Sequence, residues 1–147
     1  MKYRHMVLLV IALIMLFPTA YSEITQEEFD QWYDQITYLV EEIGTRTVGT
    51  EEYDRAYEYL IAQFEKAGMV RDNETLWESG CIANGYDTAS IVGVKPALNE
   101  NPRIITVCAH FDSNAPGARD NASGVAAMLL AMEHFNRLAP YPDTELR

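Results

Sequence analysis

The sequence predicts an α/β protein of three layers, in which helices flank a mixed β-sheet. Two segments with apolar residues at helical spacing, 25–43 and 50–67, come first in the chain. Short segments that are β-branched or strongly apolar follow, and a third helical segment spans 122–138. In sheets of this kind, sites form beyond the carboxyl ends of the strands. The order of the elements therefore predicts the fold class and indicates where a functional site would lie.

The first predicted helix begins at a capping box. Thr25 is followed three residues later by Glu28, and Gly44 ends the helical pattern. The apolar residues between them recur at helical spacing and are Phe29, Trp32, Ile36, Leu39 and Ile43. We expect these residues to face the core.

The second predicted helix begins at Thr50, a suitable N-cap, and stops at Gly68. Its expected buried stripe consists of Tyr53, Ala56, Leu60, Ile61, Phe64 and Ala67. The aromatic residues of both helices are interpreted as core residues, and an aromatic ligand cage is the alternative.

Strands are expected after Gly68, where the period of the pattern changes. Segments 74–78 and 88–94 are short and partly β-branched, whereas 103–109 is strongly apolar. The last of these predicts a buried strand at the centre of the sheet. Segment 144–147 resembles the approach to one more strand.

Residues 1–22 have the pattern of a secretory signal peptide, which leaves 23–147 as part of one domain. A basic start is followed by an apolar run that is too short for an ordinary membrane-spanning helix. An uncleaved N-terminal anchor is the alternative. Both interpretations predict export, and the first predicts a secreted or periplasmic protein without stable membrane insertion.

The chain is strongly acidic, with a formal net charge of −11. Removal of residues 1–22, which contain Lys2 and Arg4 but no acidic residue, makes the remainder still more negative. Nucleic acids and anionic lipids are therefore poor partners, because phosphate contacts need a basic face. Cations, metal ions included, are attracted to such a surface.

The chain contains only two cysteines, Cys81 and Cys108, which do not make a disulfide framework. Cys108 lies in the apolar segment 103–109, and we expect a buried thiol. Whether Cys81 and Cys108 form a disulfide stays open at this point.

Three residues that suit a metal site follow the apolar strand. His110 can donate a ring nitrogen to zinc, and Asp112 lies where a carboxylate commonly orients a metal-bound histidine. A Pro-Gly turn brings back Asp120, whose two oxygens could bridge two metal ions. The alternatives are a hydrogen-bonded His–Asp pair and an aspartate that caps the helix after it.

The segments 110–113 and 116–126 closely resemble the signature of the di-zinc aminopeptidases, which include leucyl and aminopeptidase-Y-like enzymes. Segments 46–50 and 90–96 are similar to the N-terminal region and an early strand of that family. Glutaminyl cyclases share the fold. The resemblance covers most of residues 26–147.

The resemblance implies a site with two zinc ions that removes N-terminal residues from peptides. His110 would bind one zinc ion, Asp120 would bridge both, and Asp112 would be the catalytic carboxylate that orients the site. Arg119 replaces an acidic or amide residue that is common in the family, at a position that binds no metal.

The sequence departs from the family at its end. In the family, a strand such as the one that begins near Leu146 leads to a Glu-Glu pair that supplies the general base and a zinc ligand. A further aspartate and a distal histidine complete the site, and these 147 residues contain none of them. His134, on the predicted third helix, is interpreted as exposed and not as a substitute ligand.

The sequence thus predicts the N-terminal portion of an exported zinc aminopeptidase, inactive alone and weak in zinc binding. The alternatives are a zinc enzyme similar to glutaminyl cyclase, and a non-catalytic relic or binding module with the same fold.

Overall fold

The computed structural model describes residues 24–71, 78–83, 85–138 and 141–147. The predicted signal peptide and residues 74–77 of the first predicted strand lie outside these ranges. The helical elements are α2 (Gln26–Thr37), the π-helical η1 (Tyr38–Ile43), α3 (Glu51–Lys66), the kinked turn η2 (Ala118–Ala122) and α4 (Ser123–Leu138). Within the described ranges, no helix has the length and apolar character needed to cross a membrane.

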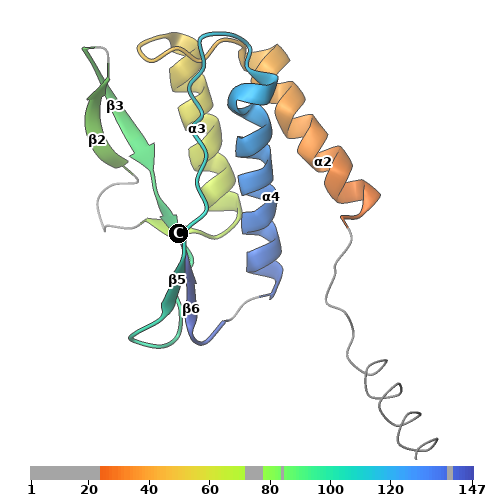
Figure 1. The fold of residues 1–147 in the computed structure, drawn as a ribbon, viewed down its shortest axis with the longest axis vertical. Helices are drawn as coiled ribbons and strands as arrows, with labels where there is room; N and C mark the ends of the chain where they lie inside the picture. Colours follow the sequence, from red (N-terminus) through yellow and green to blue (C-terminus); the bar gives the residue numbers. More distant parts are fainter. Residues whose placement is uncertain (1–23, 72–77, 84, 139–140) are drawn as a thin grey trace, which may run out of the picture.

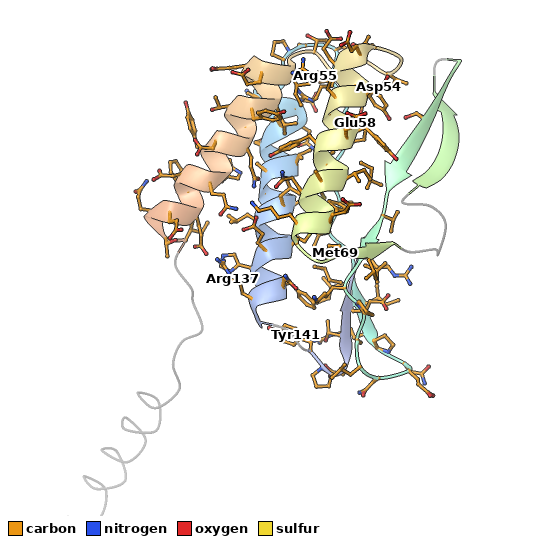
Figure 2. The ribbon with its side chains drawn as sticks, turned by 180° about the vertical axis from the view of Figure 1, so that it is seen from behind. Asp54, Arg55, Glu58, Met69, Arg137 and Tyr141 are labelled. Carbon is orange, nitrogen blue, oxygen red and sulfur yellow. The ribbon has the colours of Figure 1, made fainter. Side chains whose placement is uncertain are left out.

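The strands are short. They are β1 (Val70–Arg71), β2 (Glu78–Ala83), β3 (Tyr86–Ile91), β4 (Gly93–Val94), β5 (Arg103–Ile105) and β6 (Thr144–Leu146). The three long helices lie together on one side of the strands, with α4 between α2 and α3 (Figures 1 and 2). The α/β class is confirmed.

The expected helix ends are confirmed. Thr25 Oγ1 accepts a hydrogen bond from the N–H of Glu28, and Glu28 Oε2 accepts one from the N–H of Thr25. Thr50 caps α3 by accepting from Tyr53 N–H. Gly44 and Gly68, which follow η1 and α3, have φ of 92° and 66°, where a side chain would be strained.

The core lies between the helices and the strands. Its buried residues include Leu39, Ile43, Ala56, Leu60, Phe64, Ala67, Met69, Val125, Leu129, Met132 and Leu146. Phe29 was expected in this core but is half exposed, although its neighbour Glu28 contacts α4. Gly93 allows α3 to approach β4, since a Cβ at this position would lie 2.6 Å from the ring of Phe64.

The strands pair in three ladders. β2 and β3 form an antiparallel hairpin, β1 pairs antiparallel with β4, and β5 pairs in parallel with β6. Two hydrogen bonds between the backbones of Lys95 and Leu146, of 2.8 and 3.1 Å, join β6 to the residue after β4. β6 therefore lies between β4 and β5, and the strand expected near 144–147 is confirmed.

The expectation of a buried central strand over 103–109 is wrong. Only Arg103–Ile105 form a strand, and the side chains of Ile104 and Val107 are 53% and 37% exposed. The last backbone hydrogen bond on this side runs from Val107 N–H to the O of Arg147, the residue after β6, at 2.8 Å. The residues after Val107 pass the end of β6 and have no strand beside them in the described ranges.

The segment 106–109, which follows β5, borders an apolar cavity of about 460 Å³. The cavity separates this segment from β3 and β4, and residues of α3, α4 and β6 also line it. Cys108 is a free, exposed thiol at its rim, which corrects the expectation of a buried one.

Candidate metal centre

The structure brings together the three residues that the sequence singled out. His110 Nε2 lies 3.0 Å from Asp120 Oδ1, and His110 Nδ1 lies 3.3 Å from Asp112 Oδ1. Asp112 also offers its backbone oxygen to Nδ1 at 3.2 Å. The imidazole therefore has a carboxylate at each ring nitrogen.

The cluster of His110, Asp112 and Asp120, called the corner below, is open to solvent. The side chains of His110 and Asp112 are about half exposed, and that of Asp120 is 86% exposed. Ion pairs this exposed contribute little to stability, because water screens them. Their accessibility suits them instead to a ligand that arrives from solution.

The donor set fits part of a zinc site. Nitrogen and oxygen ligands bind zinc at about 2.0–2.2 Å, so two atoms 3.0 Å apart can contact one ion after a small adjustment. Asp112, at the other ring nitrogen, occupies the place from which a carboxylate orients a metal-bound histidine. Within the described ranges, no three His, Cys, Asp or Glu side chains are grouped so that they could hold a metal ion. Catalytic zinc sites normally use three protein ligands.

The loop between Asp112 and Asp120 is fixed by a buried serine and a glycine. Ser113 is buried and its hydroxyl donates to Ala115 O at 2.6 Å. Gly117 has φ of 66°, and a Cβ there would lie 2.6 Å from Asp120 O and 2.9 Å from Ser113 Cβ. The Pro116-Gly117 turn expected from the sequence is therefore present, and it requires glycine.

Asn121 joins the two halves of the corner. Its Nδ2 donates to His110 O at 3.3 Å, and the peptide bond that precedes Asn121 is cis. Gly124 leaves room for this side chain, because a Cβ on Gly124 would lie 2.1 Å from Asn121 Oδ1. Sequence reasoning passed over Asn121, although its position beside Asp120 was a usable signal.

Arg46 is the second residue that sequence reasoning did not single out. Its side chain is fully buried, and its Nε donates to Phe111 O at 2.7 Å, between His110 and Asp112. Burial lowers the pKa of Arg46, and the nearby carboxylate of Asp112 opposes that effect. Arg46 lies in the family-like segment 46–50, but the resemblance implied no role for it.

His134 lies away from the corner and is not exposed as expected. Its side chain is 32% exposed, and Nε2 is 2.7 Å from Glu28 Oε1. Arg137 Nη2 contacts the same oxygen at 2.7 Å. The trio joins α2 to α4, and Figure 2 labels Arg137 at the end of α4 farthest from the corner. His134 is thus a structural residue that links α4 to α2 in this fold.

The part of the chain that contains the corner is similar to a known protein family. Residues 90–147 match the model of peptidase family M28. This stretch contains His110, Asp112 and Asp120. The match confirms the resemblance to a peptidase family over this part of the chain.

Solved structures with a similar fold include an aminopeptidase and glutaminyl cyclases, the two kinds of enzyme considered from the sequence. A leucine aminopeptidase precursor from Bacteroides thetaiotaomicron is 24% identical, with a TM-score of 0.62 over 84% of this chain and 47% of that one. A glutaminyl cyclase from Tannerella forsythia is 24% identical, with a TM-score of 0.62 over 80% of this chain and 44% of that one. A glutaminyl cyclase from Fimbriiglobus ruber is 19% identical, with a TM-score of 0.63 over 84% of this chain and 45% of that one. The chain thus spans less than half the length of each.

Proposed function

We propose that this chain carries the first corner of a zinc-dependent aminopeptidase site, in a protein that is exported. The observation that carries the proposal is the placement of His110 between Asp120, 3.0 Å from Nε2, and Asp112, 3.3 Å from Nδ1. The match of residues 90–147 to a peptidase family supports it.

In this proposal, His110 and Asp120 hold zinc, and Asp120 is the residue able to bridge to a second ion. Zinc would supply Lewis-acid chemistry and a water of lowered pKa. Asp112 accepts the Nδ1 proton of His110, so that Nε2 keeps the lone pair that a metal ligand needs. Asn121, through its bond to His110 O, keeps the two ligand-bearing loops together.

The open, acidic character of the corner suits a peptide N-terminus. The carboxylates of Asp112 and Asp120 are exposed and attract a protonated α-amino group. The neighbouring apolar cavity includes His110 and Asp112 in its lining, so an apolar segment could lie next to the corner.

A glutaminyl-cyclase-like enzyme is the second candidate. It is favoured by the solved cyclases that share the fold at the same TM-scores as the aminopeptidase. A non-catalytic module that retains the fold is the third candidate, and the absence of a third donor among the described residues favours it.

Zinc titration of the purified chain tests the corner. We expect weak binding that falls about tenfold or more in His110→Ala and in Asp120→Asn, because each removes one of two donors. Asp112→Asn should have a smaller effect, because it only reorients His110. His134→Gln is the matched control, since it removes a histidine outside the corner.

Zinc also binds to other acidic groups on the surface, so calorimetry alone does not report on the corner. The titration should therefore also be followed through the NMR signals of the His110 ring. Unchanged zinc affinity in both His110→Ala and Asp120→Asn would contradict the proposed site.

Export depends on residues 1–22, which lie outside the described ranges. Expression with these residues in a bacterial host should yield an extracytoplasmic product that begins near residue 23, as measured by mass spectrometry. An intact N-terminus on a cytoplasmic product would contradict export.

A further inference from the structure

We propose that Arg46 is a positioning residue that fixes the distance between the loop of His110 and the loop of Asp120. The inference rests on the proposed function, because it assumes that these two residues bind a metal ion. It concerns a residue that touches neither metal nor substrate.

Arg46 reaches three separate segments through its guanidinium. Nε donates to Phe111 O at 2.7 Å, and Nη1 lies 3.0 Å from Pro116 O. Nη1 also lies 2.8 Å from Leu39 O and 2.7 Å from Gly44 O, at the end of η1. Since Nη1 has two hydrogens for three carbonyls, one of these bonds is shared.

The two site loops are attached to the same cation. Phe111 separates His110 from Asp112, and Pro116 begins the turn that leads to Asp120. A displacement of the guanidinium therefore moves both loops relative to η1. The main chain of Arg46 adds to this link, because its O accepts from Ser113 N–H at 3.0 Å and its N–H donates to Ser113 Oγ at 3.3 Å.

The burial of Arg46 is unusual for a residue with only a structural task. Its side chain is 0% exposed, and its Nη2 has no hydrogen-bond partner among the described residues. A buried charge without full pairing is costly, and an apolar residue would fill the space without that cost. An apolar residue cannot supply the several N–H donors of the guanidinium. Two of their four acceptors, Phe111 O and Pro116 O, are carbonyls of the site loops.

The test compares Arg46→Lys and Arg46→Met with Arg55→Met. Arg55 is exposed on α3 and its Nη2 donates to Glu42 O at 2.9 Å, so the control also removes an arginine bonded to η1 (Figure 2). We expect Arg46→Lys to lower zinc affinity measurably, by less than the roughly tenfold expected for loss of a zinc donor, at a temperature where circular dichroism shows it folded. Arg55→Met should bind zinc as the unaltered chain does.

A purely structural role gives a different result. If Arg46→Lys lowers the melting temperature but keeps the zinc affinity, the proposal is overturned. If both Arg46 variants fail to fold, the proposal is tested in the unaltered chain, by following the NMR signal of the Arg46 Nε–H during a zinc titration. We expect that signal to shift in step with His110, and a constant signal would overturn the proposal.

Failure of the proposed function is distinguishable from failure of this inference. If zinc does not bind at His110 in the unaltered chain, amide exchange of the metal-free protein still tests the loop. Arg46→Lys should then speed exchange at residues 111–117 more than elsewhere, whereas uniform acceleration would contradict a positioning role.

Discussion

Glu28 shows how one buried carboxylate can join two helices. Its carboxylate accepts from the Thr25 N–H and pairs with His134 and Arg137 of α4. These contacts, the backbone hydrogen bond of Thr25 foremost, hold the pKa of Glu28 at about 2, below its ordinary 4.5, although burial acts in the opposite direction. Its position in the first turn of α2 also suits a negative charge.

The lowered pKa predicts an acid-sensitive contribution to stability. A carboxyl whose pKa is depressed by folding stabilises the protein above its unfolded pKa, and the contribution is lost as pH falls toward the folded pKa. We expect the stabilisation from Glu28 to be complete above about pH 4.5 and to disappear toward pH 2.

The stabilisation from Glu28 is measured by comparing the melting temperature of Glu28→Gln with that of the unaltered chain from pH 7 to pH 2. The variant should melt lower at pH 7, and the two curves should approach each other near pH 2. Glu27→Gln, in the same turn, is the control. A constant difference from pH 7 to pH 2 would contradict the assignment.

Residues of the candidate centre could be found from the sequence only where they are close along the chain. His110, Asp112 and Asp120 fall within one short segment, and their spacing was informative. Arg46 contacts Phe111 and Pro116, which lie 65 and 70 residues away. No local pattern encodes such a contact, so only the folded structure reveals it.

At the scale of elements, caps and glycines predicted the helices well. The hydrogen bonds of Thr25 and Thr50, and the positive φ of Gly44 and Gly68, are local properties that the sequence expresses directly. Strand burial is not local, because it depends on what covers each face. Segment 103–109 is apolar enough for a central strand, yet Ile104 and Ile105 are exposed even where the segment pairs with β6, because no helix in the described part of the chain covers their side chains.

The approach of α3 to β4 predicts a strict requirement for glycine at position 93. Gly93→Ala places a methyl group 2.6 Å from the Phe64 ring and 3.2 Å from Met69 Cβ. We expect a loss of about 1–3 kcal/mol in unfolding free energy, measured by chemical denaturation.

A double-mutant cycle separates this clash from other effects. Phe64→Leu destabilises by itself, but Gly93→Ala should cost less in its presence because the ring is gone. Additive costs would show that Phe64 does not limit the space at Gly93.

At the scale of the whole molecule, the α/β class and the strand near 144–147 agree with the sequence. The described ranges supply two metal donors in a solvent-exposed corner, and the fold neighbours are more than twice as long as the part they share with this chain. The absence of the family's further site residues from these 147 residues was already predicted from the sequence.

The open corner predicts that the 147-residue chain is catalytically silent. With zinc present, it should release no leucine from a chromogenic leucine amide and form no pyroglutamate from a peptide with N-terminal glutamine. The reason is the lack of a third donor among the described residues. Zinc-dependent turnover that disappears in His110→Ala would contradict this prediction.

The exposed edge at residues 106–109 has a consequence for handling the protein. Val107 N–H is bonded to Arg147 O, but the residues after Val107 have no strand beside them in the described ranges. Their backbone groups can template association with another chain, and the exposed apolar side chain of Val107 favours it. Cys108, a free thiol on the same edge, can then be oxidised to a disulfide between two copies. The amount of covalent dimer in a non-reducing gel thus reports how often two molecules meet edge to edge.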